Sequence, residues 1–109
     1  MRLYRAWRNA IDGKKVRLTI TEIKILKQSI QSLDNTAEVF LFGSRVDDNQ
    51  RGGDIDILIQ SQHLSRRDLR HIRGEFCQQF GEQKLDLVID NGADNQAFIK
   101  MIQLEAVLL

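Results

Sequence analysis

Residues 39–59 read VFLFGSRVDDNQRGGDIDILI, and the remaining elements can be placed around this stretch. It opens with a short apolar run, Val39–Phe42, which has the length and composition of a buried strand. A polar, glycine-bearing loop follows, and Asp54–Ile59 is a second strand candidate. Side chains alternate across a strand, so Asp54 and Asp56 share one face. Two carboxylates spaced in this way lie roughly 6–7 Å apart at the backbone, so they can converge on one hard cation.

A third carboxylate, Asp86, lies in the segment Lys84–Ile89, which also has the pattern of a strand. Taken alone, Asp86 could pair with Lys84 or lie exposed at a sheet edge, because an unpaired acid is costly to bury. Beside Asp54 and Asp56 a metal site is the better interpretation, since a cation stabilises like charges gathered on one face. Mg²⁺ prefers oxygen ligands, and one or two carboxylates commonly hold it together with substrate phosphates. The three aspartates therefore predict a Mg²⁺ site.

The loop after the first strand predicts a phosphate contact. Gly43 lets the main chain approach a ligand closely, and Ser44 offers both a hydroxyl and an amide. Arg45 and Arg51 can neutralise phosphate charge. Other interpretations fail on spacing. An EF-hand loop beginning at Asp47 would lack its final glutamate, and the Gly-Lys-Ser/Thr ending of a P-loop is absent.

Apolar periodicity predicts three helices around these strands. Thr19–Glu22 has the form of a capping box, which begins a helix that should end near Asp34. A second helix should run from residue 64 or 65 to Phe80, where Gly81 stops it. The segment 37–42 is apolar on both faces, so we expect a central strand. A last helix is expected from about residue 95 to 106, and its apolar side should comprise Phe98, Met101, Ile102 and Leu104 or Val107.

Composition indicates one small domain. The chain has 109 residues, and its 16 Lys and Arg residues nearly balance 15 Asp and Glu residues, which argues against a general affinity for nucleic acid or membranes. A single cysteine, Cys77, excludes an internal disulfide and fits a reducing compartment. No apolar run approaches the ~18 residues of a membrane span. We therefore expect a cytoplasmic domain over residues 17–109. A basic N-terminal extension, residues 1–16, either packs on that domain or contacts a partner.

The combined pattern resembles that of the polymerase-beta-type nucleotidyltransferase superfamily. It consists of Gly43-Ser44, nine residues, Asp54-x-Asp56 and a later Asp86 in an apolar strand. Within this superfamily, the small size and the run quoted above are most similar to the minimal nucleotidyltransferase (MNT) proteins. The resemblance covers about residues 17–109. It implies an α+β, two-layer nucleotidyltransferase fold with helices packed against a mixed β-sheet.

The same resemblance implies an activity and a role for each site residue. The activity would be transfer of AMP from ATP to a hydroxyl, with one or two Mg²⁺ ions. Asp54 and Asp56 would bind the metal, while Asp86 would complete the catalytic metal site and help to deprotonate the attacking hydroxyl. The β- and γ-phosphates would be held by the loop after the first strand, at Gly43, Ser44 and Arg45.

The resemblance also implies a partner. MNT proteins are often encoded beside a HEPN-domain protein and act as antitoxins, some of them by adenylylating a tyrosine of that partner. A HEPN-domain protein is therefore the expected acceptor, nucleic acid and membranes are not expected partners, and a homo-oligomer stays open. One alternative is a non-catalytic antitoxin, an interaction module that masks its partner. Another is nucleotidyl transfer to RNA or a small molecule, which only the basic extension favours.

Overall fold

The structure, a computed structural model, describes residues 18–43 and 54–109. Four strands form one mixed sheet in the order β3-β2-β1-β4, in which β2 is parallel to β3 and the other pairs are antiparallel. The α+β class with helices packed on a mixed sheet is confirmed. In chain order the elements are α2 (Ile20–Leu33), β1 (Glu38–Phe42), β2 (Ile55–Gln60), α3 (Arg66–Phe80), β3 (Leu85–Asp90), α4 (Gln96–Gln103) and β4 (Val107–Leu108).

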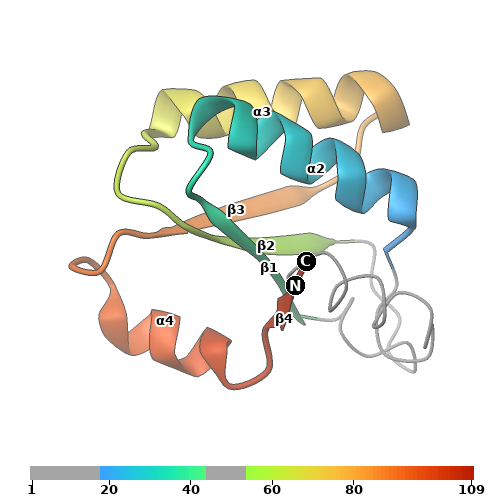
Figure 1. Cartoon of the computed structure of the whole chain (residues 1–109). Coiled ribbons are helices and arrows are strands. Elements are labelled where there is room, and N and C mark those ends of the chain that lie inside the picture. Colours follow the sequence, from blue (N-terminus) through green and yellow to red (C-terminus); the bar gives the residue numbers. More distant parts are fainter. Residues whose placement is uncertain (1–17, 44–53) are drawn as a thin grey trace.

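The helices are divided between the two faces of the sheet (Figure 1). Helices α2 and α3 lie on one face, where the side chains of Ile57 and Ile59 on β2 belong to a core shared with Ile30 and Phe76. Helix α4 lies on the other face, in a smaller cluster that includes Leu58. Strand β2 is therefore buried on both sides, which accounts for its almost continuous apolar sequence.

Local signals define the ends of α2 and α3 as predicted. At the start of α2, the Thr19 hydroxyl accepts a hydrogen bond from the Glu22 amide, at 3.1 Å. The Glu22 carboxylate accepts one from the Thr19 amide, at 2.9 Å, which completes the capping box. Helix α3 ends at Gly81, whose φ of 79° is readily adopted only by glycine. None of the helices in the described ranges combines the length and hydropathy that crossing a bilayer requires.

The C-terminal segment differs from the prediction of a helix over residues 95–106. Helix α4 ends at Gln103, and β4 pairs with β1 instead. The amide of Leu109 donates to the Val39 carbonyl at 2.8 Å, and the Leu109 side chain is buried in the core. Burial of this leucine and the hydrogen bonds to β1 draw the last residues into the sheet, which overrides the helical periodicity.

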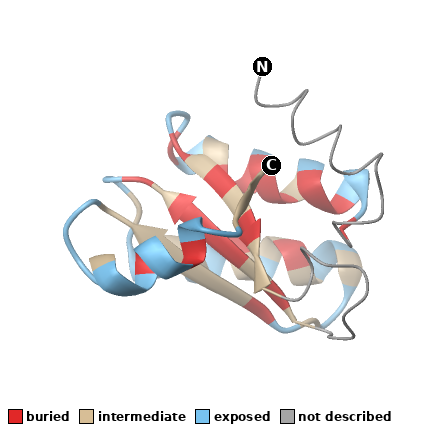
Figure 2. Cartoon of the chain, turned by 90° about the horizontal axis from the view of Figure 1, so that it is seen from below, coloured by how far each residue is buried: buried red, intermediate tan, exposed pale blue. Residues whose placement is uncertain are grey.

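The predicted apolar side of the last helix was also wrong in part. The side chains of Ile99 and Ile102 are the buried ones on α4. Phe98, Met101 and Leu104 are instead 50%, 69% and 88% exposed. In Figure 2, which views the molecule from the α4 side, this helix is largely exposed. Because apolar residues occupy both sides of α4, its periodicity could not identify the side that faces the sheet.

A polar network joins the end of α2 to the end of β2. The Asp34 side chain accepts hydrogen bonds from the Ser61 hydroxyl, at 2.5 Å, and from the hydroxyl and amide of Thr36, at 2.6 and 3.0 Å. These bonds, with that from Ser61 the most important, hold the pKa of Asp34 below its ordinary value of 3.8. The network thereby fixes the α2–β1 turn against the residue that follows β2.

We expect Ser61→Ala to lower the urea midpoint of unfolding clearly more than Ser29→Ala does. Both serines are buried, but the Ser29 hydroxyl has no hydrogen-bond partner among the described residues, so its loss leaves no group unsatisfied. A carboxyl with a lowered pKa stabilises the fold above pH 3.8, and this contribution is lost as pH falls through the lowered pKa. The difference between the urea midpoints of the two variants should therefore shrink as the pH is lowered into the acid range. A difference in midpoint that does not change with pH would contradict this account.

Candidate active site

The predicted metal-binding aspartates meet at the amino ends of the two parallel strands. Asp56 and Asp86 are direct neighbours in the β2–β3 ladder, one residue into each strand. Asp54 lies just before β2. The Ile55 amide donates to the Lys84 carbonyl at 3.0 Å, and this bond fixes the two strand starts side by side. The structure thus brings Asp86, which is distant in sequence, beside Asp54 and Asp56.

The carboxylates lie on the same face of the sheet as α4. Side chains two residues apart on a strand share a face, so Asp56 shares one with Leu58, and Asp86 shares one with Val88. Leu58 and Val88 belong to the cluster beneath α4. Asp56 and Asp86 are only half-buried. They are therefore held by packed strands and remain accessible to a ligand.

The pKa of Asp56 reflects its partial burial and the closeness of the other carboxylates. Burial raises the pKa of the Asp56 carboxyl, and the negative charge of Asp86 and a hydrogen bond with its carboxyl raise it further. The charge of Asp54 acts in the same direction, whereas the positive charge of Lys84 opposes these effects. The fold therefore holds Asp56 where its ionised form is disfavoured unless positive charge is near.

Lys84 supplies positive charge at this cluster. Its ammonium lies 3.4 Å from Oδ2 of Asp54, and the two side chains are 68% and 47% exposed. The sequence reasoning considered Lys84 as a partner of Asp86, but the recorded ion pair is with Asp54. The proximity of Lys84 to Asp54 follows from the register of β2 and β3, which the sequence does not provide.

Gly43, which the sequence predicts to contact phosphate, lies against the side chain of Asp56. It follows β1 with a φ of 78°, in the left-handed region that favours glycine. A Cβ atom at this position would overlap Oδ2 of Asp56 and lie 3.1 Å from its Cγ. Glycine is therefore required for the observed position of Asp56, whatever its role toward phosphate. Ser44, Arg45 and Arg51, the other predicted phosphate contacts, lie outside the described residues.

We expect Gly43→Ala to destabilise the protein more than Gly92→Ala. Both glycines have a positive φ, which costs an L-residue about 1–2 kcal/mol, but a Cβ on Gly92 would have no neighbour within 4 Å. Most of the extra loss of unfolding free energy at Gly43 should disappear when Asp56 is first replaced by alanine, which removes Oδ2 and Cγ but keeps Cβ at 3.3 Å. Denaturant unfolding of wild type, the two single variants and the double variant measures this. Equal losses from both glycine substitutions would show that Asp56 does not press on Gly43.

The chemistry of this donor set fits Mg²⁺. Carboxylate oxygens are its preferred protein ligands, and a divalent cation would relieve the repulsion that disfavours ionised Asp56. Within residues 18–43 and 54–109, no three acidic, histidine or cysteine side chains are already arranged as a complete ligand set. The fit therefore rests on donor chemistry and on the adjacency of Asp56 and Asp86 in the sheet.

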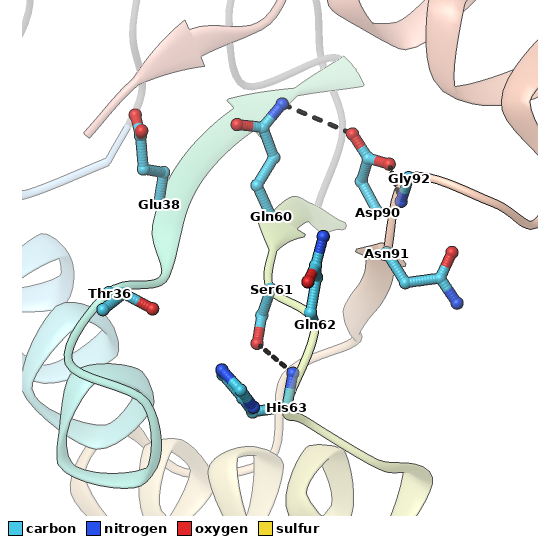
Figure 3. A pocket seen from close by; sticks show the side chains of 9 residues that line it. All are labelled: Thr36, Glu38, Gln60, Ser61, Gln62, His63, Asp90, Asn91 and Gly92. Atoms are coloured by element: carbon cyan, nitrogen blue, oxygen red, sulfur yellow. Dashed lines mark hydrogen bonds between the residues drawn. The ribbon is translucent and has the colours of Figure 1, made fainter.

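A second polar region lies at the opposite end of the same strands. A pocket there is lined by Gln60, which is paired in register with Asp90, and by the residues that follow both strands (Figure 3). Asp90 accepts hydrogen bonds from the Gln60 and Gln96 side chains, at 3.3 and 3.1 Å, and from the Gly92 amide, at 3.0 Å. This carboxylate is satisfied by neutral donors within the chain. The acidic cluster and this pocket are therefore separate features at opposite ends of β2 and β3.

Comparison with protein families agrees with this geometry. The family model described as polymerase beta, nucleotidyltransferase matches residues 24–109. This range contains the whole sheet, α3, α4, all three aspartates and most of α2. The chain therefore belongs to the polymerase-beta-type nucleotidyltransferase superfamily, which supports nucleotidyl transfer as its activity. No curated protein matches the chain closely enough to narrow this assignment.

Proposed function

We propose that this chain is a Mg²⁺-dependent enzyme that transfers AMP from ATP to a hydroxyl of a HEPN-domain partner, in the manner of an MNT antitoxin. The observation that carries the proposal is the enforced adjacency of Asp56 and Asp86, with Asp54 close by, in a nucleotidyltransferase domain. Nucleotidyltransferase domains generally use Mg²⁺ and a nucleoside triphosphate. The ATP donor and the protein acceptor follow from the resemblance to MNT proteins.

Each residue has a distinct role in this proposal. Asp54 and Asp56 hold the metal, and Asp86 completes the metal site and takes up the proton of the attacking hydroxyl. A bound Mg²⁺ would activate the oxygen nucleophile and neutralise charge on the pyrophosphate leaving group. Gly43 allows the main chain to come close to the donor phosphates, with Ser44 and Arg45 in support. The fixed strand register positions the carboxylates before substrate binds.

The test is the intact mass of the neighbouring HEPN-domain protein after incubation with this chain, ATP and Mg²⁺. We expect the partner to gain AMP, and Asp86→Asn to slow this gain by at least about 100-fold, because a positioned base typically contributes that much. Asp90→Asn is the matched control. It changes the same residue type at the far end of β3, where neutral donors satisfy the carboxylate, and should leave the rate nearly unchanged.

Two results would contradict the proposed transfer. Equal rates of AMP transfer by wild type and Asp86→Asn would show that the carboxylate cluster takes no part in the reaction. Absence of any mass gain with wild type, while the two proteins still form a stable complex, would favour masking over catalysis. AMP appearing on added RNA but not on the partner would instead support the nucleic-acid alternative.

A non-catalytic antitoxin is the second candidate, and α4 provides the observation that favours it. Its outer side and C-cap present Phe98, Met101 and Leu104 to solvent, and exposed apolar residues grouped in this way are typical of interaction surfaces. In this case the chain would neutralise its HEPN-domain partner by covering it. Catalysis and masking can be separated because the exposed side of α4 and the carboxylates are different residues.

If masking suffices, Asp54→Asn should still protect cells from the partner, whereas Met101→Glu should lose protection. A charge at Met101 is costly to bury in an apolar interface, so we expect affinity for the partner to fall by about 10-fold or more. Calorimetric titration of the two purified proteins measures this. Lys100→Gln, also at an exposed position on α4, lowers the net charge by the same single unit and is the control for the charge change itself. Loss of protection by Asp54→Asn with an intact complex would reject masking.

A further inference from the structure

A positively charged side chain of the protein itself, Lys84, lies beside the carboxylate cluster. We propose that Lys84 is an internal counter-cation, whose ammonium stabilises Asp54 in the metal-free protein and competes with a divalent metal ion for that carboxylate. This inference rests on the proposed function, since it concerns the same site. It assigns a regulatory role to a residue outside the predicted site residues.

The first support is the position of the ammonium. Nζ of Lys84 lies 3.4 Å from Oδ2 of Asp54, one of the carboxylates proposed to hold the metal. The same positive charge acts on Asp56, because it opposes the effect that the neighbouring aspartates have on that carboxyl. One ammonium therefore pairs with Asp54 and is close enough for its charge to act on Asp56 as well.

The second support is that the main chain of Lys84 is held in place. Its carbonyl accepts a hydrogen bond from the Ile55 amide at 3.0 Å, so the residue is fixed beside the start of β2. The carbonyl of the next residue, Leu85, accepts one at 3.1 Å from Nε of Arg73 on α3. A lysine at this point of the ladder emerges beside the acidic pair, and only its flexible side chain must order to reach Asp54.

The third support is the charge of the cluster. Three carboxyl groups lie near one ammonium, so a net negative charge remains to attract a divalent ion even when Asp56 and Asp86 share a proton. An exposed ion pair contributes little to stability and is readily exchanged. A cation that occupies Asp54 repels an incoming metal ion, and Coulomb's law in screened water puts this penalty at about three- to ten-fold in affinity. Metal binding at this site is thus an exchange of one cation for another.

The experiment measures Mn²⁺ binding to the full chain by electron paramagnetic resonance, with Mn²⁺ as the probe for the Mg²⁺ site. We expect Lys84→Met to bind Mn²⁺ about three- to ten-fold more tightly than wild type at low salt, with a smaller gain at high salt. At the same Mn²⁺ concentration its unfolding temperature should rise more than that of wild type, because tighter binding to the folded state stabilises it more.

Two control variants make the outcome specific. Lys84→Arg keeps the charge and should bind Mn²⁺ as wild type does. Lys24→Met removes an exposed lysine from α2, on the other face of the sheet, and should also leave binding unchanged. Unchanged or weaker Mn²⁺ binding by Lys84→Met would overturn the inference. Wild-type binding that is insensitive to Asp86→Asn, or no binding at all, would instead overturn the metal site of the proposed function and the inference with it.

Discussion

The parallel ladder between β2 and β3 places two carboxylates side by side, and the arrangement of the site depends on this constraint. Asp56 and Asp86 would separate if the strands could shift, but the register is fixed by the core. A slip of one residue would turn the buried Ile57 and Ile59 of β2 toward the wrong face and expose Leu58 to the α2–α3 side. Hydrophobic burial of β2 on both faces thus holds together charges that repel each other.

The aspartates of this fold show how local partners give one residue type opposite properties. Asp34 receives hydrogen bonds from hydroxyls and an amide, which favour its charged form and lower its pKa. Asp56 is partly buried beside other carboxylates, which disfavour its charged form and raise its pKa. The first arrangement stabilises the fold. The second leaves a requirement for positive charge, which Lys84 meets in part and a bound metal ion would meet more fully.

Sequence predicts most of this fold where the signals are local. The Thr19–Glu22 capping box and Gly81 define helix ends through contacts within a few residues, and the alternation of Asp54, Asp56 and Asp86 with apolar residues assigns their faces. Other features depend on contacts distant in sequence. The two residues of β4 are too few to show a periodicity, and the buried side of α4 is decided by the sheet. The close approach of Gly43 to Asp56, which leaves no room for a Cβ atom, follows from the β1–β2 register.

The short length of α4 bears directly on access to the site. Its eight residues span about 12 Å, whereas the six residues of β2 extend about 20 Å, so α4 cannot cover the full length of the strand. It packs over Leu58 and Val88 and leaves Asp56 and Asp86, earlier on the same face, half-buried. A helix over residues 95–106, as the periodicity suggested, would be about 18 Å long and nearly match the strand. Because α4 ends at Gln103 and the chain then adds β4 to the sheet, the helix does not cover the acidic end of this face.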